Sequence, residues 1–246
     1  MGAMMHHALR LRPAFLVFQT LALALLVLLP PPAWAQGYTY THYQKNMAFR
    51  NDEERALAGD ILARAPDAVT LQEVNRDNDK LLAMLAQAYP SQEFCTFKGI
   101  GGVAVLSRWP LVPGSNQCIR PLGAVAIQVQ MPQGRVWVIS VHLETRDKPR
   151  HARQAQRLGA YLSQVPGPKI IGGDFNNAPQ SGPVRDVANG AGVNRIGAAI
   201  TTRRVGGLLG VPIDFVFASG GRGEVTQLPL LGSDHYGVWA EFTMAD

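Results

Sequence analysis

The segment KIIGGDFNN, residues 169–177, predicts the fold more sharply than any other part of the chain. Two isoleucines indicate a short buried strand, two glycines follow, and the strand runs directly into Asp174 and then Asn176. A carboxylate at the end of a buried strand is costly unless a partner offsets its charge. The segment therefore indicates a core strand that ends at a catalytic or binding site.

The same pattern recurs along the chain, because several apolar segments run into a carboxylate, an amide or a histidine. These polar residues are Asn46, Glu73, His142, Asp214, Asp234 and His235. Ends of strands in one sheet lie close together, so we expect four carboxylates, two amides and two imidazoles to converge. The carboxylates would repel one another, and Mg²⁺, which prefers oxygen ligands, resolves that repulsion. The histidines would supply proton transfer near neutral pH.

Hydrophobic periodicity predicts more strands than helices and no strict alternation of the two. Helices are expected at residues 52–65, 78–89, 150–165 and 182–188, and strands at 38–46, 67–74, 102–107, 124–130, 136–142, 169–173, 213–218 and 238–242. The glycine-rich stretches 206–210 and 219–223 are short enough to be loops. Two mixed sheets packed face to face, with helices outside, suit this pattern better than one parallel sheet.

The first 35 residues differ from the rest in composition. Arg10 and Arg12 are their only charged residues, residues 15–29 are largely apolar, and three prolines precede Ala33-Trp34-Ala35. This order predicts a secretory signal cleaved after Ala35, with residues 36–246 as a single catalytic domain that is periplasmic or secreted. The alternative is a retained membrane anchor, for which the apolar stretch is short, since a bilayer span needs about 20 residues.

Composition excludes a disordered chain, since 47 % of residues are hydrophobic and 17 % charged. Without Arg10 and Arg12 the formal charge falls from +5 to +3, which suits an anionic substrate but equally serves solubility. There is no G-x-S-x-G motif for a serine hydrolase and no C-x-x-C pair for a zinc site. Whether Cys95 and Cys118 form a disulfide stays open, although export would permit one.

Seven segments in order resemble the endonuclease/exonuclease/phosphatase superfamily, and they span nearly all of the expected mature chain. They are KNM (45–47), LQEV (71–74), GGVAVLSR (101–108), SVHLET (140–145), GGDFNN (172–177), PIDFVFAS (212–219) and SDHYGV (233–238). The resemblance implies a four-layer α/β sandwich and a metal-dependent phosphoesterase, with Mg²⁺ or Mn²⁺ as the cofactor. It departs from the family pattern at Gly237, where the family often has proline.

The resemblance also implies roles for single residues. Glu73 would be the main metal ligand, with Asn46 and Asp234 as further metal contacts. His142 would be a general acid or phosphate contact, and Asp174 would orient or deprotonate the attacking water. Asp214 would orient His235, which would contact the scissile phosphate or act as the base. Which group takes the proton of the water stays open.

Substrate contacts are expected from Asn176, Arg203 and Arg204, since guanidinium groups bind phosphate in a bidentate manner. The basic run that begins with Arg146 and contains His151 is expected on the surface. The leading substrate hypothesis is a phosphodiester, with nucleic acid first and a lipid headgroup or inositol phosphate as alternatives. A non-catalytic binding module is the rival of another class. No stable protein partner is implied, and a monomer is expected.

Overall fold

The computed structural model describes residues 37–75, 79–97 and 101–245. Residues Tyr38–Asp246 form one compact unit. The predicted signal lies in residues 1–35, outside the described residues, so its cleavage stays a prediction. Within the described ranges, no helix is both long enough and apolar enough to cross a bilayer.

Two six-stranded sheets form the centre of this unit. In spatial order the first contains β13 (Arg222–Leu228), β14 (Gly237–Thr243), β1 (Tyr40–Asn46), β2 (Ala68–Val74), β4 (Gly102–Ser107) and β3 (Ser91–Thr96). The second contains β5 (Gln117–Ile119), β6 (Ala124–Met131), β7 (Gly134–His142), β8 (Lys169–Asp174), β12 (Asp214–Ala218) and β9 (Asn194–Arg195). The central pairs β1–β2 and β7–β8 are parallel, and the other neighbouring strands pair antiparallel.

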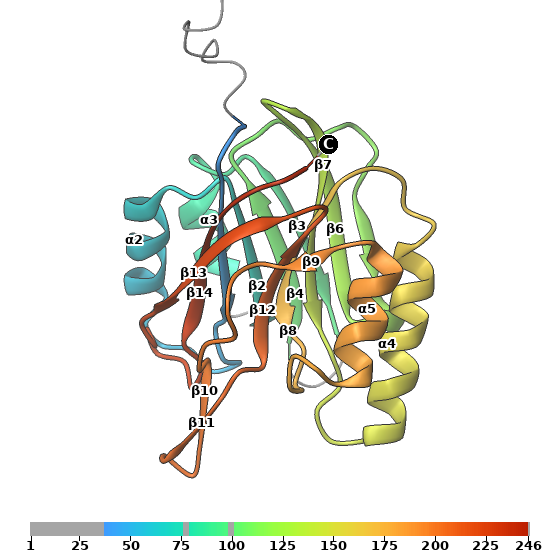
Figure 1. The fold of residues 1–246 in the computed structure, drawn as a ribbon. Helices are drawn as coiled ribbons and strands as arrows, with labels where there is room; N and C mark the ends of the chain where they lie inside the picture. The colour runs from blue at the N-terminus through green and yellow to red at the C-terminus, as the bar shows by residue number, and fades with distance from the viewer. Residues whose placement is uncertain (1–36, 76–78, 98–100, 246) are drawn as a thin grey trace, which may run out of the picture. The chain divides into compact units, whose positions relative to one another are not determined.

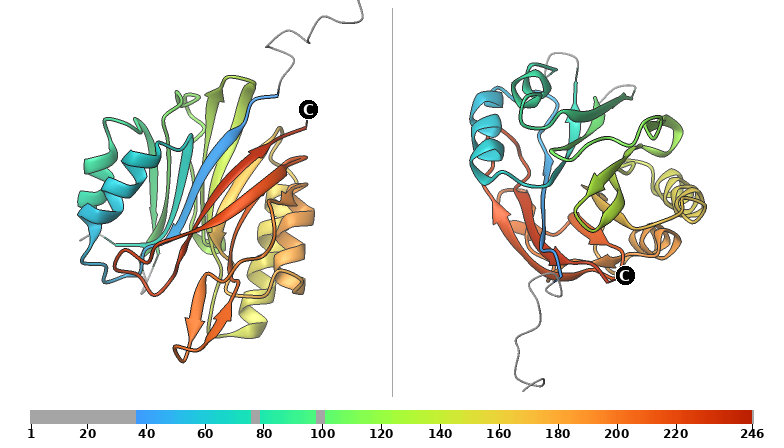
Figure 2. Two further views of the ribbon diagram at one scale, coloured as in Figure 1. Left: turned by 60° about the vertical axis from the view of Figure 1, so that its left-hand side comes forward. Right: turned by 90° about the horizontal axis from the view of Figure 1, so that it is seen from above.

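Helices cover the outer face of each sheet, as Figures 1 and 2 show. Helices α2 (Glu54–Arg64) and α3 (Asp79–Leu85) pack on the first sheet, and α4 (Lys148–Leu162) and α5 (Gly182–Ala191) pack on the second. The order helix, sheet, sheet, helix confirms the predicted four-layer sandwich.

The predicted elements lie within a few residues of the observed ones, but several strands were missed. Besides β3, β5, β9 and β13, a separate hairpin of β10 (Arg203–Val205) and β11 (Leu209–Val211) was not expected. The stretch 206–210, expected as a loop, contains the turn of this hairpin. These strands are short or at sheet edges, where exposed polar residues weaken the alternating pattern.

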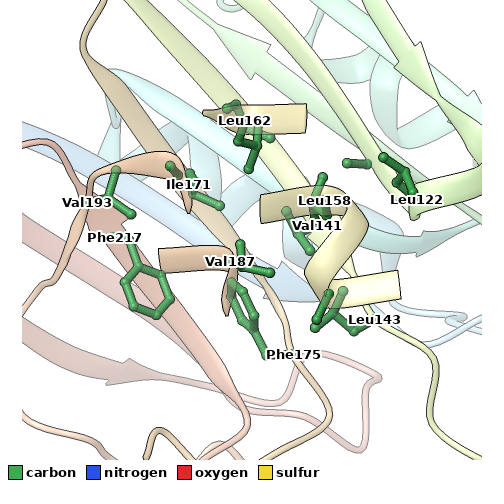
Figure 3. Close-up of a cluster of buried hydrophobic side chains, with 14 of the residues drawn as sticks. Leu122, Val141, Leu143, Leu158, Leu162, Ile171, Phe175, Val187, Val193 and Phe217 are labelled. Carbon is green, nitrogen blue, oxygen red and sulfur yellow. The ribbon is translucent and has the colours of Figure 1, made fainter. Parts of the chain in front are cut away.

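The outer face of the second sheet holds α4 through an apolar stripe. Ala155, Leu158 and Leu162 recur at helical spacing, and the two leucines lie over Val141 and Ile171 of the sheet (Figure 3). Burial of each such leucine stabilises the fold by about 1.5–3 kcal/mol. The helix begins after Asp147, whose side chain accepts a hydrogen bond from the Arg150 N–H at 2.9 Å.

The layer between the two sheets changes from apolar to polar along the strands. At one end it contains apolar residues such as Tyr40, Ala68, Val138 and Ile170. Further along the same four strands, the inward positions are His42, Gln44, Thr70, Gln72, Ser140 and Gly172. Gln72 Nε2 donates to Ser140 Oγ at 3.1 Å and so joins the sheets. Because side chains alternate along a strand, the next inward residues are Asn46, His142 and Asp174.

A disulfide joins the two sheets at their edges. Cys95 in β3 and Cys118 in β5 are bonded, with their Cα atoms 5.3 Å apart. The two cysteines, whose pairing the sequence left open, therefore form a disulfide.

Gly172 allows the sheets to approach closely at the start of this polar layer. A Cβ atom at this position would lie 2.1 Å from Thr70 Oγ1 and 2.6 Å from His42 Nε2. These two side chains are buried and bonded to each other at 2.9 Å, so neither can move without losing a partner.

We expect Gly172→Ala to lower the free energy of unfolding by about 1–3 kcal/mol, because the added methyl group overpacks the layer. Gly59→Ala is the matched control, since a Cβ there has open space within α2 and should stabilise by about 0.4–1 kcal/mol. Urea unfolding measures both. Equal stability of the wild type and Gly172→Ala would show that the sheets can separate at no cost.

His42 makes stability depend on pH. Burial lowers the pKa of His42 to about 3, so the folded protein keeps this imidazole neutral where an unfolded chain, with a pKa near 6.5, binds a proton. The contribution of the neutral, buried His42 to the free energy of unfolding is therefore present above pH 6.5. It is lost as the pH falls from 6.5 toward 3, by about 1.4 kcal/mol per pH unit. We expect the unfolding free energy of His42→Asn to fall less steeply in this window. Parallel pH profiles of the two proteins would contradict this.

Candidate active site

Three predicted site residues occupy one row across the second sheet. His142 pairs in register with Asp174 on the parallel neighbour β8, and Asp174 pairs with Asp214 on the antiparallel neighbour β12. Residues directly opposite on neighbouring strands point to the same face. The three side chains therefore point between the sheets, where they are at most 5 % exposed.

Asp174 lies at the centre of the site. Its Oδ2 accepts a hydrogen bond from Asn46 Nδ2 at 2.9 Å and lies 3.7 Å from His142 Nε2 and 3.8 Å from His235 Nε2. Its Oδ1 accepts the N–H of Asn176 at 2.8 Å. The Asp174 carboxylate is thus fixed by the Asn46 amide and a backbone N–H. The imidazoles of His142 and His235 lie at longer distances.

Asp214 and His235 form a buried pair. Asp214 Oδ2 lies 2.9 Å from His235 Nδ1, and Asp214 Oδ1 accepts from Gln44 Nε2 at 3.2 Å. Thr202 Oγ1 accepts the Asp214 N–H at 3.1 Å. Because Nδ1 is bonded to Asp214, the other ring nitrogen, Nε2, is directed toward Asp174.

The electrostatics of this group are unusual. Burial, and then the charge on Asp214, raise the pKa of Asp174, although His235, His142 and Asn46 oppose this. For His235, burial alone lowers the pKa, but the charge and hydrogen bond of Asp214, with the charges of Asp174 and Asp234, together outweigh burial and raise the pKa to about 9. The site therefore contains an aspartate that holds a proton more readily than usual beside an imidazole that is cationic at neutral pH.

Glu73 reaches the same site from the first sheet through a backbone irregularity. The β2–β4 register shifts between Gln72 and Val74, and Glu73 has a φ of 59°, which is rare for a non-glycine residue. Its Oε1 accepts from Asn46 Nδ2 at 3.1 Å and its Oε2 accepts the Phe49 N–H at 2.9 Å. Asn46 thus connects Glu73 to Asp174 across the two sheets.

The donor set suits a hard divalent cation. Asp174, Asp214 and His235 each offer a ligand atom, and these atoms lie within 4.8 Å of one another. Two carboxylates in such proximity repel, which adds to the effect of burial in raising the pKa of Asp174. Oxygen ligands are those that Mg²⁺ prefers. The carboxylates of Asp174 and Asp214 therefore fit Mg²⁺, whereas His235 offers a nitrogen atom. Asn46 donates its side-chain amide to Glu73 and Asp174, so its contact with a metal stays a prediction.

The remaining predicted residues surround this centre at different depths. Asn176 donates its side-chain amide to the Leu143 carbonyl at 3.0 Å. Asp234 is 58 % exposed and forms an ion pair of 2.7 Å with Arg203, while its Oδ1 lies 3.9 Å from His235 Nε2. Arg204 is exposed on β10. Their roles in binding metal or substrate stay predictions.

Two aspects of the sequence interpretation need correction. Asp214 and His235 do not follow a strand, because Asp214 begins β12 and His235 precedes β14, both of which run antiparallel to the central strands. His151, expected on the surface, is 5 % exposed, and burial lowers its pKa. It belongs to the buried stripe of α4 with Ala155 and Leu158, a spacing that the sequence contained.

Lys45 is a buried residue next to the site that the sequence interpretation missed. Its ammonium group is fully buried and donates to the carbonyls of Pro229, Leu230 and His235 at 2.9, 2.6 and 2.6 Å. Burial lowers its pKa to about 8 against the opposing charges of Asp214 and others. The sequence did contain an indication of this burial. Lys45 alternates with the apolar Tyr43 and Met47, which are buried on the outer face of the same central strand.

A family model with the description Endonuclease/Exonuclease/phosphatase family matches residues 27–235. The chain belongs to this family. Members of the family are hydrolases that act on phosphoester bonds. No curated protein sequence matches the chain.

Solved structures share the family fold at low sequence identity. TDP2 of D. rerio, complexed with single strand DNA product, has a TM-score of 0.65 at 17 % identity and covers 84 % of this chain and 99 % of its own. Sphingomyelinase C from Streptomyces griseocarneus scores 0.62 at 19 % identity, with 83 % and 99 % covered. A mutant beta toxin from Staphylococcus aureus with bound magnesium ions scores 0.64 at 15 % identity, with 85 % and 100 % covered. These likenesses show the fold.

Removal of the Lys45 ammonium should loosen the loop that carries His235. We expect Lys45→Met to lower the free energy of unfolding by roughly 1–3 kcal/mol, because the carbonyls of Pro229, Leu230 and His235 lose the ammonium group that donates to them. We also expect faster amide hydrogen exchange at residues 230–236 than in the wild type.

Lys169→Met is the matched control for this variant. Lys169 is also largely buried, but its Nζ donates only to the Gly167 carbonyl, at 3.0 Å, among the contacts of the described residues. Unchanged exchange at residues 230–236 in Lys45→Met would show that Lys45 does not hold this loop.

Proposed function

We propose that this family member is an exported, Mg²⁺-dependent phosphodiesterase that hydrolyses its substrate by in-line attack of water. The observation that carries the proposal is the group formed by His142, Asp174, Asp214 and His235, which are far apart in sequence and meet between the sheets. Two imidazoles that both lie within 4 Å of one buried carboxylate fit the binding and cleavage of a phosphate ester.

Asp174 is proposed to take the proton of the attacking water. Its raised pKa makes it a better proton acceptor than an ordinary aspartate. His235 is the weaker candidate for the base, because with a pKa of about 9 it already carries a proton at neutral pH. It is instead proposed to donate from Nε2 to an oxygen of the scissile phosphate, while Asp214 holds the ring through Nδ1.

His142 is proposed to act as the general acid, donating a proton to the leaving oxygen as its bond to phosphorus breaks. It lies on β7, on the side of Asp174 opposite from Asp214, whereas His235 precedes β14, so the two imidazoles reach the central carboxylate from different elements. Asn176, two residues after Asp174, is proposed to position the phosphate, and Arg203 and Arg204 are proposed to contact the substrate at the edge of the site.

Glu73 and Asn46, with Asp234, are proposed to hold Mg²⁺, while the carboxylates of Asp174 and Asp214 offer further oxygen atoms. When bound, Mg²⁺ would neutralise the negative charge that builds on the phosphate oxygens. A structural relative, beta toxin, contains bound magnesium ions. Mn²⁺ would suit the same oxygen ligands.

The substrate is proposed to be a phosphodiester, with nucleic acid as the leading candidate and a lipid headgroup or an inositol phosphate as alternatives. The relatives support both kinds, since one is bound to a DNA product and another is a sphingomyelinase. A phosphatase acting on a small ester is the nearest rival. A non-catalytic binding module is opposed by the retention of every predicted carboxylate and imidazole.

Export is supported by two independent features. The first is the basic, apolar and A-x-A order of residues 1–35. The second is the Cys95–Cys118 disulfide, since disulfides persist in oxidising compartments and are rare in the cytosol.

A metal-dependent activity panel tests the proposal. With Mg²⁺ the protein should hydrolyse at least one of single-stranded DNA, duplex DNA, RNA, sphingomyelin, inositol phosphates and bis-p-nitrophenyl phosphate. Asp174→Asn and His235→Asn should each lower kcat by roughly 10²–10⁴-fold, because each removes a group that acts in proton transfer or charge stabilisation.

Asp186→Asn on the outer helix α5 is the matched control and should retain full activity. Calorimetry with Mg²⁺ separates the rivals, because a non-catalytic module need not bind the ion. Turnover retained in both site variants, or no turnover of any substrate by Mg²⁺-loaded protein, would overturn the assignment.

A further inference from the structure

The β10–β11 hairpin exposes apolar side chains to an unusual degree. Leu208 is 90 % exposed, Leu209 64 % and Val205 55 %, which makes them the three most exposed large hydrophobic residues of the described chain. Gly206 and Gly207 have φ values of 60° and 75°, as the tight turn of a hairpin requires. Contiguous exposed apolar side chains commonly mark a binding surface for a protein or a membrane.

This hairpin is attached directly to the active site. Arg203 bridges to His235 and forms an ion pair with Asp234. The Thr202 hydroxyl accepts the Asp214 N–H, and the Thr202 carbonyl accepts the Tyr236 N–H at 2.6 Å. Figures 1 and 2 show the hairpin projecting away from the two sheets at the end where β8 finishes and β12 begins. A ligand bound at the tip is therefore held close to Asp234 and His235.

Exposed basic residues lie at the same end of the domain. Arg204 is exposed at the base of the hairpin, and Arg146, Lys148 and Arg150 are exposed at the start of α4, which begins at this end in both figures. The hairpin itself, residues 203–211, contains two arginines and no acidic residue. An apolar tip beside cationic side chains is the arrangement that binds an anionic lipid surface, with the apolar groups inserted and the cations at the phosphates.

We propose that the β10–β11 hairpin docks this protein onto a membrane surface that contains anionic phospholipids. The tip residues Val205, Leu208 and Leu209 insert among the acyl chains, and Arg204 lies at the level of the headgroups. A nucleic acid is the less suitable occupant, because residues 203–211 contain no aromatic ring on which a base can stack. Docking on the membrane does not depend on catalysis. The further step, in which docking presents a lipid phosphodiester to the site, rests on the proposed function.

Vesicle sedimentation tests the docking separately from hydrolysis. The chain beginning at Gln36, which contains the whole compact unit with its own core, is mixed in EDTA with vesicles of phosphatidylcholine, with or without phosphatidylglycerol. We expect binding to the mixed vesicles, and a loss of roughly tenfold or more in affinity for the double variant Leu208→Ser with Leu209→Ser. Arg204→Gln should weaken binding to the mixed vesicles by about fivefold.

Leu62→Ser is the matched control, because Leu62 is an exposed leucine, 43 % accessible, on the outer helix α2. It should bind vesicles as the wild type does. Thermal unfolding and Mg²⁺-dependent hydrolysis of bis-p-nitrophenyl phosphate should be the same in the double variant and the wild type, because the tip residues are outside the core and the site.

The outcomes separate the two proposals. Absence of vesicle binding by the wild type, or equal binding by the double variant, overturns the docking proposal whatever the enzymatic result. Weaker binding of duplex DNA by the double variant, with vesicle binding unchanged, would instead assign the hairpin to nucleic acid. Vesicle binding lost in the double variant, in a protein that hydrolyses no phosphodiester, would support docking and refute only the proposed function.

Discussion

Two buried carboxylates, Asp174 and Asp214, occupy paired positions on adjacent strands and point into the same space between the sheets. Two like charges in a low-dielectric layer are strongly unfavourable unless protons, cations or hydrogen-bond donors offset them. The surrounding residues supply these: Asn46 and the Asn176 N–H donate to Asp174, and His235 and Gln44 bond Asp214. The site is therefore the arrangement that makes the burial of these two acids tolerable.

This requirement extends through the layer between the sheets. Each sheet has a parallel central pair, β1–β2 and β7–β8, whose carboxyl ends meet at one end of the sandwich. The inward residues become polar toward that end, so the residues of the candidate site lie beside a hydrogen-bonded layer that includes Gln72 and Ser140. Such a layer orients its members more sharply than apolar packing does, because each lost hydrogen bond leaves a buried polar atom unsatisfied.

The segments that carry His235 and the apolar hairpin are held by different means. Lys45, on the outer face of the first sheet, donates to three carbonyls of residues 229–235 and so holds the segment that carries His235. Thr202 bonds the base of the hairpin to Asp214 and Tyr236, while the tip is left exposed to solvent. The rigid base and exposed tip divide the hairpin into a part that completes the site and a part that is open to a binding surface.

The sequence alone determined the four layers, the central strands and the residues that converge, because alternating burial and abrupt polar strand ends are local patterns. It could not determine that β12, which begins at Asp214, and β14, which follows His235, run antiparallel to the central strands, since strand direction depends on which neighbour each strand pairs with. It also left the Cys95–Cys118 bond open and missed Lys45, whose partners lie more than 180 residues away. Only the tertiary structure decides such contacts, because the distance between two residues depends on the packing of the sheets and not on their separation in the chain.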